Sequence, residues 1–504
     1  MGAELLSTTI IYLTWTYTLT TRFVNPEEWK NKDFQASHYL HWGCLYKLED
    51  VKISWHIPQA AEIDFALELF RNIVEPAMNT LKGLIRQGDL NDTIWRNDFC
   101  RHLTFASKAF SDIFCLVRDV VTPEELRANI ETSDVRYEIP EMLAAVEPIS
   151  APWVLRDPAH PDYQYLTDLR KQFGTLLHQS SMMLRHDEGS AIDAIQVLTC
   201  SIRTYLLECG DDFQNGMQML ESLSNDMNSS RQFPHQKELS RKAWAQKART
   251  HNTFRFALNY AKRRYTDIED HLIHDVVEWS LWQYATVREE NQSLLGELVS
   301  YYDGSARRVL PVLYGALDPS TGVDRMKGAL WTLKMDVFVN YITEEPDLVV
   351  ELVRKIFMLQ QVHKDSSMQD YVAALVGAIK GGLTEPCLLI YDIDNPYLDS
   401  ATKDLKRTLI YVVEDTTVTV RARKQRNARV KIWDESAKKA VEDILTIAQS
   451  PDIHWVYTIY AVQFLQFLIR RDVPPSPSQL KYLLEKLSES NETIRYVWMS
   501  LSAC

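Results

Sequence analysis

The stretch "IHWVYTIYAVQFLQFLIRRDVPP", Ile453 to Pro475, decides the fold class because it is the most apolar part of the chain. Its first seventeen residues carry no formal charge, which is the shortest length that could span a membrane. Gln463, Gln466 and Arg470 recur at intervals of three and four, so a helix would place these polar side chains on one face, where lipid would not accommodate them. The stretch therefore predicts a buried helix and not a membrane anchor.

Short amphipathic segments flank this stretch. "DESAKKAVEDILTIAQ" (434–449) precedes it, and "SQLKYLLEKLSE" (478–489) and "NETIRYVWMSL" (491–501) follow it. Their apolar residues follow helical spacing and are Ala440, Val441, Ile444, Leu445 and Ile447, then Leu480, Leu483, Leu484 and Leu487, then Ile494, Val497, Trp498 and Leu501. Each segment predicts a helix that cannot bury its apolar stripe alone. Ser478 and Asn491 are the predicted N-caps.

The spacing of these helices indicates a repeat. Successive hairpins begin near Asp434 and Ser478, 44 positions apart, within the ~40–47 residues of HEAT and armadillo helix pairs. Similar short helices are predicted at 211–226, 290–317, 346–361 and 368–382, the second of them broken at Asp303-Gly304. The predicted fold is all-α, an α-solenoid of about five to eight irregular HEAT/armadillo-like helix pairs.

The predicted organisation is one continuous HEAT-like array over 1–504. Within it we expect an N-terminal helical segment (51–130), central helical repeats (160–390), an irregular basic connection (391–430) and C-terminal helical repeats (431–504). Strand candidates are restricted to 51–57 and 409–423, and the apolar residues 1–23 predict a core helix.

The amino-acid composition limits the kinds of molecule that the chain is expected to bind. The 504 residues include 68 acidic and 55 basic side chains, for a formal charge of −13, which argues against nucleic acid as a general partner. The hydrophobic fraction of 46% supports a large buried core. Seven cysteines at irregular spacings predict reduced thiols.

The chain lacks the sequence motifs of common enzymes. It contains no Gly-rich phosphate loop, no Gly-x-Ser-x-Gly and no HExxH, so no catalytic residue and no metal ligand is predicted. His38, His41 and Cys44 lack a fourth ligand. The loop at 392–399 begins like a calcium loop but has Tyr397 where glycine is needed. The group "HLIHD" (271–275) predicts a helix face with solvated histidines.

The one charge anomaly is a basic cluster in "RARKQRNARVK" (421–431). Its members are Arg421, Arg423, Lys424, Arg426, Arg429 and Lys431. Two interpretations remain open: an exposed face that balances nearby carboxylates, or a site for a phosphorylated polyanion, since guanidinium groups bind phosphate bidentately.

Three stretches carry a family resemblance: "VKISWHIPQAAEIDFALELFRNIVEPAM" (51–78), "DRMKGALWTL" (324–333) and 454–501. They resemble the middle region of the large single-chain HEAT-repeat proteasome activators. This resemblance implies a dome wall that binds the end ring of the proteasome core particle. It further implies stimulated degradation of peptides and unfolded proteins without ubiquitin or ATP, no required cofactor, a link to DNA repair, and a location in nucleus and cytoplasm.

The same resemblance implies inositol phosphates as ligands of the basic cluster. Family members end in a hydrophobic-tyrosine-any tripeptide that helps to open the core particle, whereas this chain ends in Ser502-Ala503-Cys504. Neither end offers the polar cap that a solenoid needs, so we expect a piece of a longer protein. The alternative function is a HEAT-repeat scaffold or transport-type adaptor that binds a protein partner.

Overall fold

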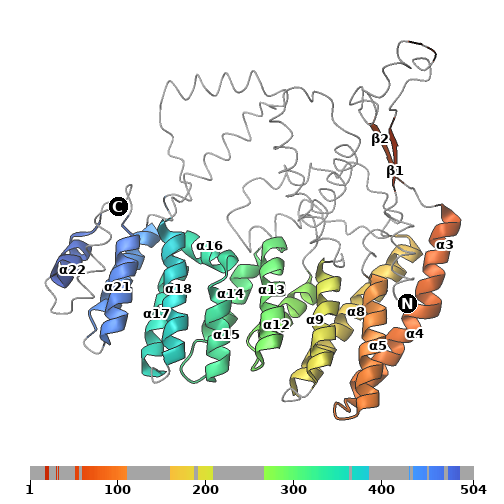
Figure 1. Cartoon of the computed structure of the whole chain (residues 1–504), viewed down its shortest axis with the longest axis horizontal. Coiled ribbons are helices and arrows are strands. Elements are labelled where there is room, and N and C mark those ends of the chain that lie inside the picture. Colours follow the sequence, from red (N-terminus) through yellow and green to blue (C-terminus); the bar gives the residue numbers. More distant parts are fainter. Residues whose placement is uncertain are drawn as a thin grey trace. The chain divides into compact units, whose positions relative to one another are not determined.

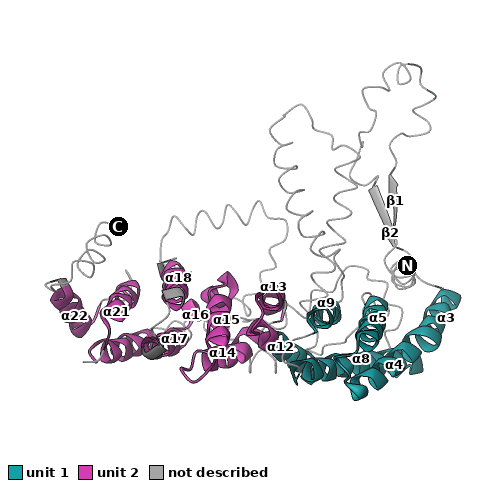
Figure 2. Ribbon diagram, turned by 60° about the horizontal axis from the view of Figure 1, so that its bottom comes forward, with its two compact units in different colours: residues 1–126, 142–276 teal, residues 127–141, 277–504 magenta. Residues whose placement is uncertain are grey.

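The computed structural model divides the chain into two compact units whose regular elements are mostly helices (Figures 1 and 2). Apart from Lys30, Lys32 and Lys431, it describes residues 17–21, 51–55, 59–110, 159–186, 191–207, 266–302, 304–362, 366–384, 435–450, 453–469 and 475–487. One unit contains residues 1–126 and 142–276, and the other contains 127–141 and 277–504. The predicted fold class, an all-α solenoid of HEAT-like helix pairs, is confirmed.

The first unit also contains a short antiparallel hairpin. β1 (Tyr17–Thr21) pairs with β2 (Val51–Trp55), with Tyr17 opposite Trp55. The predicted strand at 51–57 is therefore confirmed over Val51–Trp55. The predicted core helix over 1–23 is wrong at Tyr17–Thr21, where Thr18, Thr20 and Thr21 are β-branched and favour an extended backbone.

The helices of the first unit follow in chain order. They are α3 (Ala60–Leu69), the π-helical turn η4 (Phe70–Val74), α4 (Glu75–Gln87), α5 (Thr93–Phe110), α8 (Pro161–His186), α9 (Ile192–Leu207) and α12 (Asp267–Ser280) as far as Val276. Gly88 ends α4 in a left-handed conformation with φ of 59°, which glycine adopts without steric cost. The carboxylate of Asp92 accepts a hydrogen bond from Ile94 N–H at 2.9 Å and so caps α5.

These helices form two layers. α4 lies beside α8, and α5 lies beside α9, so the pairs α4–α5 and α8–α9 stack as successive repeats (Figure 1). Rings of Phe70, Phe110, Phe173 and Tyr205 join them in sequence, with the Phe110 and Phe173 rings stacked at 4.7 Å. Stacking buries the apolar stripes that no single short helix could bury.

The second unit continues the same pattern. It contains α13 (Ala285–Tyr301), α14 (Ser305–Gly315), α15 (Val323–Leu333), α16 (Asp336–Glu344), α17 (Pro346–Met358), η6 (Leu359–Val362), α18 (Ser366–Thr384), a helix at 435–448, α21 (Trp455–Phe467) and α22 (Pro477–Leu487). Gly304, with φ of 76°, makes the predicted break before α14. The helices predicted at 346–361 and 368–382 are confirmed as α17 with η6 and as α18, whereas the one predicted at 211–226 lies outside the described residues.

The stretch that decides the fold class is a buried helix, as predicted. α21 buries Tyr457, Ala461 and Leu465 completely and packs against α18. The Tyr457 ring meets Phe357 of α17 edge-on at 5.6 Å. Within the described ranges, no helix combines the length and the apolar character that crossing a membrane requires.

The last described helix, α22, differs from the prediction. Ser476, not Ser478, caps it: Ser476 Oγ accepts from Gln479 N–H at 3.1 Å, and Gln479 Oε1 accepts from Ser476 N–H at 3.4 Å. Pro477 then begins the helix, where its missing N–H has no cost. The predicted N-cap Asn491 and its helix lie outside the described residues.

The buried face of α22 also differs from its predicted leucine stripe. Leu480 and Leu484 are 42% and 58% exposed, whereas Gln479, Tyr482 and Leu483 are buried. Gln479 Nε2 donates to the carbonyl of Leu465 at 2.7 Å, and Tyr482 Oη donates to that of Ala448 at 3.4 Å. Two polar side chains that reach carbonyls of the preceding helices therefore set the rotation of α22.

Candidate functional site

The predicted basic cluster falls almost entirely outside the described residues. Arg421, Arg423, Lys424, Arg426 and Arg429 belong to 385–430, of which the structure describes nothing. Lys431 is described and is an exposed helical residue. Whether these side chains form one site therefore stays a prediction. The zinc-like group at His38–Cys44, the calcium-like loop at 392–399 and the strand candidate at 409–423 also lie outside the described residues.

One hollow among the described residues of the first unit lies between α4 and α8. It has a volume of about 320 Å³. Its apolar lining is Met78 and Leu176; its polar and charged lining is Asn79, Lys82, Asp168, Lys171, Gln172, Thr175 and Gln179. Most of these polar side chains are exposed to solvent, so the hollow is an open surface feature and not an interior cavity.

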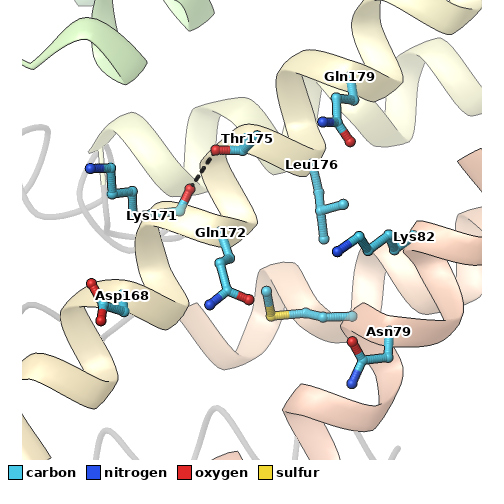
Figure 3. Close-up of a pocket in the computed structure, with 9 residues that line it drawn as sticks. Asn79, Lys82, Asp168, Lys171, Gln172, Thr175, Leu176 and Gln179 are labelled. Carbon is cyan, nitrogen blue, oxygen red and sulfur yellow. Dashed lines mark hydrogen bonds between the residues drawn. The ribbon is translucent and has the colours of Figure 1, made fainter.

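The close-up in Figure 3 shows how the polar groups lie around the apolar floor. Lys82 extends from α4 toward Leu176 of α8, and the amide of Gln172 points into the same space. Thr175 Oγ1 donates to the carbonyl of Lys171 at 2.9 Å, which leaves its oxygen lone pairs available to accept. The hollow thus offers the ammonium groups of Lys82 and Lys171, the carboxylate of Asp168 and several amides to a ligand.

A second hollow lies between the turn that follows α4 and the last turns of α8. It has a volume of about 340 Å³ and is lined by the turn that follows α4 (88–91) and by Met183 and His186 of α8. The α8 residues that line the two hollows recur at intervals of three and four: Asp168, Gln172, Thr175, Gln179, Met183 and His186. Such spacing places them on one face of the helix. We call the two hollows together the α4–α8 groove.

Polar contacts join the start of α8 to the η4–α4 segment. Arg71 Nη2 lies 2.9 Å from Oδ1 of Asp162, and its guanidinium lies over the Tyr165 ring at 5.1 Å. Tyr165 Oη donates to Glu75 Oε2 at 3.1 Å. Burial, reinforced by this hydrogen bond to Glu75, raises the pKa of Tyr165 to about 12. The phenol therefore keeps its proton at any physiological pH, and the contact stays in place beside the groove.

A buried acidic residue links α8 to α12. Asp275 is 1% exposed; its Oδ2 lies 2.7 Å from Nδ1 of His178 and its Oδ1 lies 2.6 Å from Nη2 of Arg185. Burial raises the pKa of Asp275, although hydrogen bonds from His178 and Ser181 and the charge of Arg185 oppose that rise. His271 stacks on the His178 ring at 5.0 Å. His271 is exposed, as the prediction of solvated histidines at 271–275 requires, whereas Asp275 beside them is buried.

A second polar contact connects the same two helices. Glu269, 1% exposed, accepts a hydrogen bond from Arg170 Nη1 at 3.3 Å and from the N–H of Thr266 at 3.0 Å. Its carboxylate also accepts from the Thr266 hydroxyl. Thr266 and Glu269 stand at the positions of a capping box at the start of α12. Arg170 also lies over the Tyr205 ring at 4.3 Å, so this contact includes α9.

The serine, histidine and aspartate near Asp275 do not form a nucleophilic triad. Ser181 is completely buried and bonds to the carboxylate, while His178 bonds to the same carboxylate from another side. A triad needs the imidazole between the hydroxyl and the acid. In the parts of the chain that the structure describes, no group of three His, Cys, Asp or Glu side chains could hold a metal ion.

Comparison with known proteins shows two similarities. Residues 1–117 match the family described as "Proteasome activator complex subunit 4, mid HEAT repeats region". The predicted resemblance is confirmed. "Proteasome activator complex subunit 4A" of Danio rerio is 20% identical over 483 residues, which cover 92% of this chain and 25% of the relative. The chain therefore spans about a quarter of the length of this curated relative, and it is similar to a regulatory HEAT-repeat protein.

Proposed function

We propose that this chain is a wall segment of a non-catalytic proteasome activator. In this role it contributes to binding the end ring of the core particle and to promoting degradation of peptides and unfolded proteins without ubiquitin or ATP, in the nucleus and the cytoplasm. One observation carries the proposal: stacked helix pairs occur in a chain that is similar to the middle region of such an activator. A solenoid wall supplies rigid, extended contact surface, which suits a regulatory cap.

The test is a chimera. The quarter of the zebrafish relative that aligns with this chain is replaced by this chain, and hydrolysis of a fluorogenic peptide by latent core particles is measured without ATP. We expect the chimera to stimulate hydrolysis as the relative does. The matched control replaces the same quarter by an unrelated helical solenoid of equal length, which should abolish stimulation. A folded, monomeric chimera that gives no stimulation would show that the chain does not serve as this wall.

The basic cluster at 421–431 carries a second, separate proposal, an inositol phosphate site. Its six cations are the densest positive charge in an acidic chain. A ligand that binds only the folded state raises the melting temperature, and salt weakens contacts between exposed charges. Inositol hexakisphosphate should therefore raise the melting temperature of the chain at low salt, and Arg426→Ala combined with Arg429→Ala should reduce the rise. An unchanged melting temperature at saturating ligand would mean that the cluster is a solvated face and not a ligand site.

A further inference from the structure

The α4–α8 groove is long enough to hold a stretch of polypeptide. From Asp168 to His186 its α8 stripe covers about 27 Å at 1.5 Å per residue. An extended chain advances about 3.3 Å per residue, so the groove matches about eight residues of extended peptide. Gln172 and Gln179 are one heptad apart, about 10.5 Å along the helix, which corresponds to about three residues of such a peptide.

The amides that line the groove have no hydrogen bond to another described residue. This holds for Asn79, Gln172 and Gln179, each of which carries one acceptor and two N–H donors. Such groups can bond to the N–H and C=O of an extended main chain whatever its side chains. Met78 and Leu176 provide the apolar surface between them. The arrangement is that of mixed apolar and convergent polar groups, which is typical of binding sites.

The charges select the kind of peptide. Lys82 extends into the middle of the groove and has no ion-pair partner among the described residues (Figure 3). Asp168 and Asp89 lie toward opposite ends, and Lys171 lies one helical turn from Asp168. A carboxylate at the centre of a bound peptide would meet Lys82, while negative charge at the Asp89 end would be repelled. Among the described lining residues there is no arginine to bind a phosphate bidentately, and a compact polyphosphate would meet an aspartate on either side.

We propose that the α4–α8 groove binds an extended peptide that carries an acidic side chain near its centre. The groove walls are organised before binding, because the Arg71–Asp162 contact joins α8 to η4, the Tyr165–Glu75 contact joins α8 to α4, and the Phe110–Phe173 rings stack on the other side of α8. Such preorganisation reduces the entropy that binding loses. The proposal does not depend on the proteasome, since the chain alone supplies every group.

The test measures binding of fluorescein-labelled peptides of about eight residues to the whole chain by fluorescence anisotropy. One peptide has central glutamates among serines and alanines, and matched peptides have glutamine or lysine at those positions. We expect the glutamate peptide to bind roughly tenfold more tightly than the glutamine peptide, since a hydrogen bond to a charged group is worth more than a neutral one. The lysine peptide should bind least.

Variants then locate the site. Lys82→Ala should reduce the preference for glutamate over glutamine, and Lys82→Ala combined with Lys171→Ala should remove it. Gln172→Ala combined with Gln179→Ala should instead weaken the binding of both peptides by a similar factor. Lys439→Ala, which removes an equally exposed lysine from the helix at 435–448, should change neither. All these side chains are exposed, so an unchanged melting temperature will confirm that the variants fold.

Three results would overturn the proposal. The first is no binding of the glutamate peptide up to about 1 mM, the weak end of the affinity scale. The second is a preference for glutamate that survives in Lys82→Ala combined with Lys171→Ala, which would place the site elsewhere. The third is displacement of the peptide by inorganic triphosphate at equal or lower concentration, which would make the groove an anion site and not a peptide site.

Discussion

Arg185 and Asp275 form a buried ion pair in which Nη2 of the arginine lies 2.6 Å from Oδ1 of the aspartate. The Asp275 side chain is 2% exposed and the Arg185 side chain is 21% exposed. The cost of removing the aspartate from water is large, and it is offset only while its partners remain. This pair belongs to the set of polar contacts that joins α8 to α12, and it suggests where the fold is most sensitive to single substitutions.

Removal of the arginine should destabilise the fold strongly. Arg185→Met leaves the Asp275 carboxylate buried without the guanidinium that lies 2.6 Å from it, a change that costs about 3–5 kcal/mol in comparable pairs. We expect a clearly lower melting temperature by circular dichroism. Arg101→Ala is the matched control, because its ion pair with Asp98 is exposed and should contribute little. Equal melting temperatures of the two variants would contradict a stabilising role for the buried pair.

The free energy of unfolding should depend on pH through the ionisation of Asp275. Its pKa is raised in the fold above the ordinary 3.8, first by burial, so the folded state binds this proton more tightly than the unfolded state does. The stabilisation that this proton provides is complete below pH 3.8 and is lost as the pH rises through the folded pKa. In an Asp275→Asn variant, the asparagine side chain mimics the protonated acid.

The comparison of wild type with Asp275→Asn across pH 4 to 8 therefore isolates this group. We expect the melting temperature of the wild type to fall relative to that of the variant as the pH rises. A difference that stays constant across this range, or that changes in the opposite direction, would show that His178 and Arg185 outweigh burial.

Two glycines on neighbouring helices should respond to alanine in opposite ways. A Cβ at Gly174 would lie 2.6 Å from Cγ2 of Ile268 and 2.7 Å from Cζ of Tyr205, whereas a Cβ at Gly83 would meet nothing within 4 Å. Gly174→Ala should therefore destabilise by about 1–3 kcal/mol through overpacking. Gly83→Ala should stabilise by about 0.5–1 kcal/mol, because glycine is unfavourable inside a helix. Chemical denaturation of both variants gives the comparison; a neutral Gly174→Ala would mean that the helices can separate at no cost.

Local features of the chain could be predicted from the sequence because their signals lie within one helix. The apolar run of α21, the Gly304 break and the helices α17 and α18 depend on spacing and on residues with special backbone freedom. The hairpin partner of β2 could not be predicted in the same way. It lies 34 positions away in register, and the threonine-rich β1 resembles an apolar helix by hydropathy alone.

The candidate site could not be predicted because its parts are distant in the sequence. Asp275 meets His178 and Arg185 across 97 and 90 positions, so nothing local to 271–275 reveals its burial. The α4–α8 groove likewise joins residues near 80 and near 175. The α8 residues of the groove do recur at intervals of three and four, but the residues of any exposed polar helix face recur at the same intervals. Only the packing of α4 beside α8 turns it into a lined groove.

The rotation of α22 supplies the last prediction, since the sequence pattern and the structure disagree there. The leucine stripe predicts that Leu480 is a core residue, whereas the structure leaves Leu480 42% exposed and buries Gln479 at 2%. Gln479→Leu should then cost about 1–3 kcal/mol, because the Leu465 carbonyl loses its donor in a buried setting. Leu480→Ser should cost much less. Thermal unfolding of the two variants decides between the pattern and the structure: a larger loss for Leu480→Ser would mean that α22 packs through its leucines.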